Sequence, residues 1–251
     1  MSSPALERFR NTVHDRIGSH PIVRRNAYTA WFARGTMTLD ELRTFTVQFS
    51  VFSHLFLEAQ LRKCINAGTL EGYRAGKEIL LNELGVSFGP SGSVEGSRFR
   101  FSAAHFEWLI AFAQHLGLEF GDLGKRRMGS ASTLRFCDVL REVYGSDDPS
   151  TAAGASFAIE HWAAAGFWKE LIAGLRTFKR RRMPELPLGF WTWHDAIEDR
   201  HAEHTDEELE EAFALPGFDE AAFLAGAQAV LDAVEVFWEG LAGSAEMTHV
   251  A

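Results

Sequence analysis

Apolar side chains recur every three or four residues along most of this chain, which is the spacing of one face of an α-helix. The clearest stripe consists of Phe45, Phe49, Phe52, Phe56 and Ala59. It follows Thr38 and Glu41, which form the capping box that begins a long helix. No run shows the sustained alternation of β-branched residues that is typical of a strand. The pattern therefore predicts an all-α protein.

Capping and turn residues divide the chain into separate helices. The Gly/Ser-rich stretch 85–98 is expected to be a loop, and a turn is expected at Pro184–Pro187. No repeat and no shift in composition marks a boundary, so residues 1–251 are expected to form a single helical-bundle domain. The predicted helices cover 5–17, 21–33, 38–67, 70–84, 101–116, 131–144, 150–178, 190–204, 206–214 and 219–242.

Composition excludes several classes of partner. The formal net charge of −9 over 251 residues argues against nucleic acid. No stretch reaches the roughly 18 apolar residues of a membrane span, and the N-terminus does not read as a signal peptide. Two cysteines, Cys64 and Cys137, make no disulfide framework and fit a reducing cytoplasm. We therefore expect a soluble cytoplasmic protein with a small-molecule substrate and no membrane partner; a homodimer is left open.

One segment carries a metal-binding pattern. His194, Glu198 and His201 stand at i, i+4 and i+7, within roughly 60° of one another on a helix and about 10 Å apart along its axis. Two imidazoles with a carboxylate between them can serve two metal ions. The competing interpretation is an exposed charged face. This interpretation is weakened because the mostly apolar residues 190–193 directly precede the motif.

Three further residues are candidate ligands. Glu160 lies in an apolar segment, where a buried carboxylate needs a metal, a cation or a proton. Glu83 falls in the last turn of a predicted helix, a position that is commonly exposed. His105 lies in an aromatic-rich helix and, taken alone, is more often a hydrogen-bonded core histidine than a ligand.

In order and type, these residues resemble the ligand series of the haem-oxygenase-like diiron oxidases, relatives of the quinone-biosynthesis and thiaminase-type bundles. That family carries a Glu, a His and a Glu on three core helices and a His-x3-Asp/Glu-x2-His run on a fourth. The local contexts at 82–85 and 105–109 are also similar. Two features depart from the family pattern: residues 86–98 look inserted, and a Glu stands where Asp is common. The corresponding metal ligands here are Glu83, His105, Glu160, His194, Glu198 and His201.

The resemblance implies a haem-oxygenase-like bundle that holds two Fe(II) ions and uses O2 as co-substrate. It implies oxidation of a small substrate in natural-product biosynthesis, ending in desaturation, cyclisation or fragmentation, with no catalytic residue beyond the ligands. We expect an amino-acid substrate; N-oxygenation and fatty-acid decarboxylation are alternatives. Three carboxylates and three neutral imidazoles leave a charge of +1 on two ferrous ions, which suits an anionic group. Oxygen and imidazole ligands suit Fe or Mn and do not exclude Zn.

A metal-free ligand-binding or thiaminase-like bundle is the alternative from another class. It would use Cys137 as nucleophile, but the apolar surroundings of this residue are typical of a packed thiol. A ferritin-like site needs two Glu-x2-His motifs in the core, and the second one, Glu246 to His249, falls in the last six residues. Candidate pocket residues are the aromatic Phe101, Phe106, Trp108, Phe157, Trp162 and Trp191 and, for a substrate carboxylate, Arg62, Arg74, Arg135 and Arg176.

Overall fold

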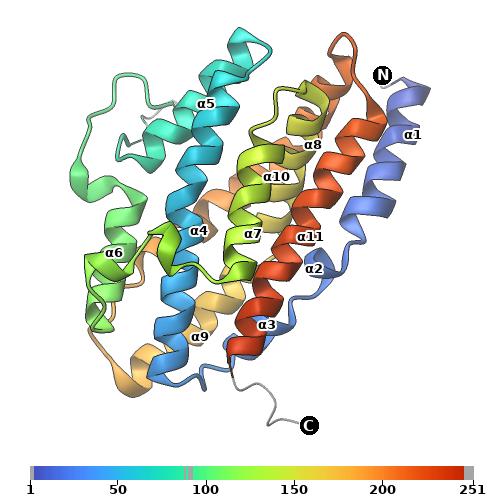
Figure 1. Ribbon diagram of the computed structural model, residues 1–251. Helices are drawn as coiled ribbons and strands as arrows, with labels where there is room; N and C mark the ends of the chain where they lie inside the picture. Colours follow the sequence, from blue (N-terminus) through green and yellow to red (C-terminus); the bar gives the residue numbers. More distant parts are fainter. Residues whose placement is uncertain (1–2, 88, 90–92, 246–251) are drawn as a thin grey trace.

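A computed structural model shows long helices running side by side around an aromatic interior (Figure 1). It describes residues 3–87, 89 and 93–245, with the backbone alone over 197–208. Within this part no strand forms, and Val86 and Phe99 make an isolated antiparallel bridge. The all-α prediction is confirmed. The described α-helices are α1 (Pro4–Val13), α2 (Pro21–Arg24), α3 (Ala27–Phe32), α4 (Leu39–Ile65), α5 (Leu70–Glu83), α6 (His105–His115), α7 (Ala131–Val139), α8 (Pro149–Ala163), α9 (Phe167–Arg182), α10 (Gly189–Ala214) and α11 (Glu220–Ser244).

Helix α4 begins as its sequence predicts and contributes an aromatic face to the interior. The Thr38 hydroxyl accepts a hydrogen bond from the Glu41 amide (3.2 Å), and the Glu41 carboxylate accepts one from the Thr38 amide (2.6 Å). Phe45 and Phe49 are buried, and Phe52 packs against this core with partial exposure. The aromatic face of α4 therefore forms one wall of the protein interior.

Helix α11 packs against α7 and α8 (Figure 1). Val230, Val234, Phe237 and Trp238 are all buried on its inner face. Within the described residues, α11 is the one helix long and apolar enough to cross a membrane, yet half of its most apolar window is buried inside the protein. Its composition is accounted for by packing, because a central helix buries side chains on most of its circumference.

Two predicted helix boundaries near the candidate ligands were wrong. The segment 150–178 is two helices, because Gly166 adopts φ +95° and a left-handed residue ends an α-helix. The segments 190–204 and 206–214 form the single helix α10, since no glycine or proline interrupts them. Glu160 consequently lies in the last turn of α8, and the 194–201 motif lies on one long helix.

One further predicted helix is divided in two, and the others differ only at their ends. The segment 21–33 breaks at Arg25 and Asn26, whose side chain caps α3 by accepting a hydrogen bond from the Tyr28 amide (3.0 Å). Residues 14–18 and 140–144 form π-helical turns after α1 and α7, and residues 101–103 form a 3-10 turn before α6.

Candidate metal centre

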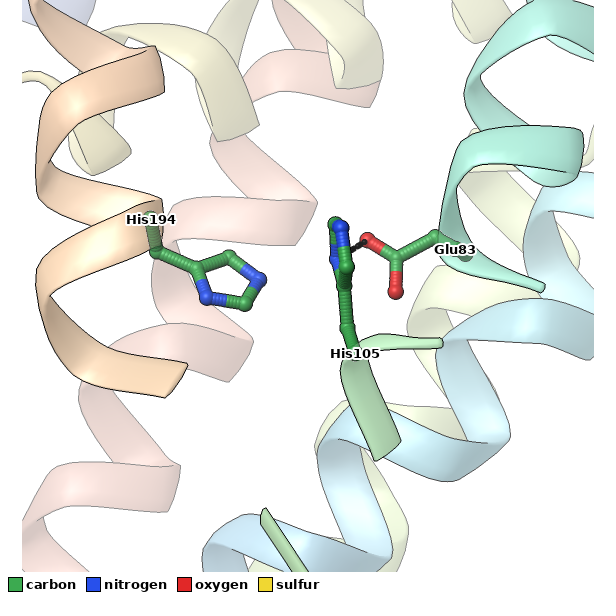
Figure 2. A group of neighbouring side chains, drawn as sticks. All are labelled: Glu83, His105 and His194. Atoms are coloured by element: carbon green, nitrogen blue, oxygen red, sulfur yellow. Dashed lines mark ion pairs between the residues drawn. The ribbon is translucent and has the colours of Figure 1, made fainter. Parts of the chain in front are cut away.

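Three predicted ligands from three helices meet in the interior. Glu83 is the last residue of α5, His105 the first of α6, and His194 lies in the second turn of α10. One ligand atom from each side chain lies within 4.8 Å of the other two. Figure 2 shows His105 between the other two side chains. The structure thus brings together residues separated by up to 111 positions in the sequence (194 − 83).

The loop between α5 and α6 holds Glu83 beside His105. Gly85 follows α5 with φ +103°, and a Cβ atom there would lie 2.4 Å from the Arg100 carbonyl oxygen, so only glycine fits. The Arg100 amide donates to the Gly85 carbonyl (2.9 Å), which closes the segment between them. The residues on either side of the apparent insertion at 86–98 are therefore held together, and Glu83 and His105 lie side by side in spite of the insertion.

Both ring nitrogens of His105 face polar atoms. Its Nδ1 lies 3.0 Å from Glu83 Oε1, but off the hydrogen-bond direction, so Nδ1 has no hydrogen-bond partner among the described residues. Its Nε2 accepts a hydrogen bond from the Trp193 indole N–H (3.0 Å). Burial alone would raise the pKa of Glu83; the neighbouring His105 and His194 outweigh it, so the pKa lies below its usual value. The Glu83 carboxyl is therefore an anion at neutral pH.

His194 presents a free lone pair. Its Nδ1 lies 2.7 Å from the Phe190 carbonyl oxygen, which can only accept, so Nδ1 carries the proton and Nε2 the lone pair. Burial, together with His105, lowers the pKa of His194 to about 4. The ring also stacks on Trp168 at 4.9 Å. A neutral histidine whose other N–H donates to a backbone carbonyl is the usual arrangement of a metal ligand.

These three side chains border a cavity of about 140 Å³, and Glu160 lines it as well. Four of the six predicted ligands therefore line one cavity. The side chains of Glu198 and His201, farther along α10, lie outside the described residues. The remaining lining residues are Asn82, Ser53, Ile79, Ile159, Ala163 and eight aromatic side chains, namely Phe49, Phe52, Phe56, Tyr144, Trp162, Phe167, Trp168 and Phe190.

The aromatic wall differs from the predicted one. Of the six candidates only Trp162 lines the cavity, and Phe101 is 77% exposed. The wall comes from α4, from Trp162 on α8 and from the first residues of α9 and α10. The phenylalanine stripe of α4 was the available signal, but periodicity alone does not say which part of a core stripe borders a cavity.

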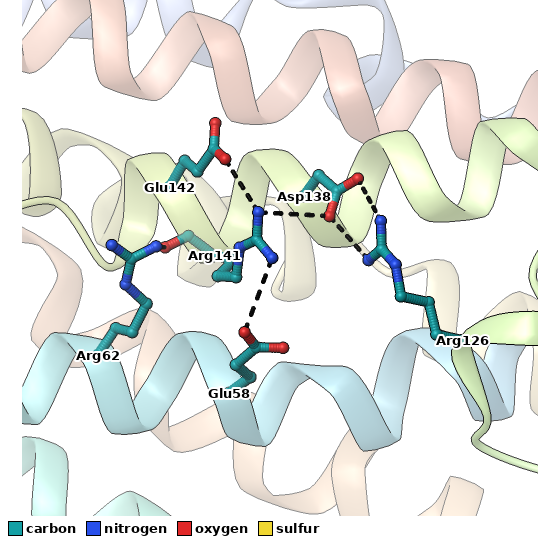
Figure 3. Close-up of polar contacts among 6 residues, drawn as sticks. All are labelled: Glu58, Arg62, Arg126, Asp138, Arg141 and Glu142. Atoms are coloured by element: carbon teal, nitrogen blue, oxygen red, sulfur yellow. Dashed lines mark hydrogen bonds and ion pairs between the residues drawn. The ribbon is translucent and has the colours of Figure 1, made fainter.

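None of the four candidate arginines lines the cavity. Arg62 lies at the surface, where its guanidinium donates to the Arg141 carbonyl (3.3 Å; Figure 3). The polar wall is formed instead by Tyr144, whose hydroxyl donates to Gln60 Oε1 (2.6 Å) and lies 3.3 Å from the Lys63 ammonium. Lys63 also donates to Ser156 Oγ (2.6 Å). Gln60 and Lys63 are three positions apart on α4, but nothing in the sequence links them to Tyr144 or Ser156.

Cys137 is a packed thiol, as predicted. It is 6% exposed, it does not line the cavity, and burial together with Asp138 raises its pKa to about 12. Asp138 itself pairs with Arg126 at the surface (Figure 3). A thiol with so high a pKa is not ionised at neutral pH, which disfavours a cysteine nucleophile.

A second group of potential ligands contains His20, Asp232 and Glu235. His20 Nδ1 accepts a hydrogen bond from the Ile22 amide (3.3 Å), which caps α2, so the proton of the neutral ring lies on Nε2, 3.2 Å from Asp232. The single lone pair of this imidazole is therefore already used by the backbone. The geometry explains this group as a structural cap.

Known structures share this architecture over nearly the whole chain. A CADD-like protein of unknown function from Nostoc punctiforme superposes with a TM-score of 0.66 at 18% identity, over 97% of this chain and 99% of that chain. A domain of unknown function from Shewanella denitrificans, described as having a heme oxygenase-like fold, gives a TM-score of 0.63 at 13% identity, over 97% of this chain and 94% of that one. The fold is haem-oxygenase-like. No protein-family model and no curated protein sequence matches this haem-oxygenase-like chain.

Proposed function

We propose that this haem-oxygenase-like protein is an O2-dependent non-haem diiron oxidase that acts on a small substrate of the amino-acid type. The observation that carries the proposal is the convergence of Glu83, His105 and His194 at an apolar cavity. Glu160 lines the same cavity, and Glu198 and His201 complete the proposed ligand set. Bound ferrous ions would supply the electrons for O2 reduction.

The described residues fit a transition-metal ion. His105 Nδ1 and Glu83 Oε1 lie 3.0 Å apart without forming a hydrogen bond. Two ligand atoms on one such ion commonly lie roughly 3 Å apart. A buried nitrogen without a hydrogen-bond partner is costly, and an ion shared with Glu83 would remove that cost. The anionic Glu83 and the neutral His194 also have the protonation states that metal ligands need.

The walls of the cavity support a compact substrate with one polar end. Aromatic rings cover most of the surface and exclude water from the neighbourhood of the ligands. Tyr144 lines one side of the cavity, and the Lys63 ammonium behind its hydroxyl places a positive charge on that side. An amino acid or a related short carboxylate matches this distribution, and a cavity of about 140 Å³ favours it over a long acyl chain.

Anaerobic titration with Fe(II) tests the proposal. We expect the wild-type chain to bind two ions and to consume O2 afterwards, faster in the presence of its substrate. Glu83→Gln should lose iron because the amide removes the negative charge that the site provides. Glu58→Gln is the matched control, since Glu58 lies on α4 with a 52% exposed side chain and contacts only Arg141 among described ion-pair partners (Figure 3). Failure of the wild-type chain to take up iron would contradict the proposal.

A further inference from the structure

Trp193 controls the protonation pattern of His105. Its indole nitrogen lies 3.0 Å from His105 Nε2, and an indole N–H can only donate. Nε2 must therefore carry a lone pair, which excludes the doubly protonated ring. The remaining proton of the neutral ring is on Nδ1, the nitrogen that faces the anionic Glu83 carboxylate. Trp193 and Glu83 thus select the same tautomer of His105.

This tautomer conflicts with metal binding. A neutral imidazole has one lone pair, and a metal ion must take that lone pair whichever nitrogen it binds. If the ion binds Nε2, it takes the place of the indole hydrogen. If the ion binds Nδ1, the ring proton moves to Nε2 and meets the indole N–H directly. In either case the Trp193–His105 hydrogen bond and ligation by His105 exclude each other.

We propose that Trp193 is a positioning residue that latches His105 in the metal-free protein, and that its indole must leave Nε2 before His105 can bind an ion. This inference rests on the proposed function. Trp193 directly precedes His194 on α10, so the same helix turn supplies both the latch and a ligand with a free lone pair. Loading of the site is therefore coupled to a movement of the Trp193 side chain.

Trp108 provides a matched control. Its ring stacks on the same His105 ring (5.2 Å, 21°) and contacts Trp193 edge-on. Its indole N–H, however, donates to the Ser102 carbonyl oxygen (2.7 Å) and leaves the lone pair of His105 untouched. Trp193→Phe and Trp108→Phe each remove one indole N–H beside His105, and only the first removes a competitor of the metal.

The affinity test is anaerobic Fe(II) calorimetry on the wild type and both variants, with circular dichroism to verify folding. In Trp193→Phe the hydrogen bond to His105 Nε2 no longer has to break before the metal binds. This variant should therefore bind Fe(II) about 2- to 10-fold more tightly than wild type. Trp108→Phe should not gain affinity. Equal or weaker binding by Trp193→Phe, in a wild type that binds iron through His194, overturns the latch and leaves the proposed function standing. No iron binding by any of the three proteins contradicts both.

A second measurement does not depend on metal. Nitrogen-15 NMR of the metal-free protein reads the tautomer of His105, whose ring signals are assigned with a His105→Gln variant. The latch predicts a proton on Nδ1 in the wild type and in Trp108→Phe. In Trp193→Phe no donor faces Nε2 and only Glu83 still favours the Nδ1–H form, so the population of that form should fall below its wild-type value. An Nε2–H ring in the wild type overturns the latch whatever the metal titrations show.

Discussion

The two acid–histidine groups of this protein contain similar residues, but they use their imidazoles differently. In the group Glu83, His105 and His194, the Phe190 carbonyl accepts a hydrogen bond from the Nδ1–H of His194, which leaves the lone pair of the ring on Nε2. In the group around His20, the Ile22 amide donates a hydrogen bond to Nδ1 and so occupies the lone pair of the ring. The first group borders a cavity, whereas Asp232 of the second has a 56% exposed side chain. Proximity of ligand types is therefore a weaker criterion for a metal site than the direction of the hydrogen bonds at each histidine.

The largest expected difference between the two groups is in iron affinity. His194→Ala removes a ligand with a free lone pair, so Fe(II) should bind at least about 100-fold more weakly. Asp232→Asn should leave the affinity within about 2-fold of wild type, because its group already uses its lone pair for a helix cap. Calorimetry under anaerobic conditions measures both. Loss of iron binding in Asp232→Asn, or its retention in His194→Ala, would contradict this difference between the two groups.

A second difference is the pH dependence of stability. His194 has a pKa of about 4 in the folded protein against a usual value of 6.5. Between these values the unfolded chain binds a proton that the folded chain does not, so stability is lost as the pH falls from 6.5 toward 4. Between pH 7 and pH 5 this group should cost about 2 kcal/mol.

Urea unfolding with a chelator present measures this effect. The wild type should lose more stability between pH 7 and pH 5 than His194→Gln, which has no ring to protonate and therefore isolates the contribution from that of the carboxylates. Parallel losses in the two proteins would show that His194 is not held neutral by its burial.

The sequence predicted local features well where a few adjacent residues determine them. The capping box at Thr38 and the end of α5 at Glu83 were both visible. The break at Gly166 was missed because apolar periodicity continues from α8 into α9, while the left-handed conformation of one glycine depends on how those helices turn back. The predicted boundary between 204 and 206 was wrong because no glycine or proline interrupts α10 there.

In the candidate site, too, residues with a local sequence pattern could be predicted and residues placed by distant contacts could not. Glu83, His105 and His194 could be proposed because they carry ligand atoms in a recognisable order. Trp193 could not, since its role depends on a hydrogen bond to a residue 88 positions away. Tyr144 and Lys63 were missed for the same reason: a polar wall assembled from separate helices leaves no local pattern. Sequence reasoning therefore finds groups that bind, but not the groups that orient them.

A smaller effect should follow from removing the histidine of the second group. His20→Ala deletes the cap that accepts from the Ile22 amide, and loss of an N-cap costs about 1 kcal/mol. Removal of a ring that is 5% exposed adds to this cost. Urea unfolding at pH 7 measures the loss, and Fe(II) titration of the same variant should match the wild type. A destabilised variant with weakened iron binding would mean that the two groups are not independent.

The smallest expected effect is that of Asp232→Asn on stability. Its carboxylate accepts from Gln228 (2.9 Å) and lies 3.2 Å from His20, but with a 56% exposed side chain it remains well hydrated. Asparagine retains an acceptor oxygen for both partners and loses only the charge. Because exposed ion pairs contribute little, the free energy of unfolding should change by less than about 0.5 kcal/mol. Asp232→Leu, which removes the acceptor, should cost more than Asp232→Asn. If both variants lose several kcal/mol, the carboxylate charge itself is required there, which contradicts a small contribution from this exposed pair.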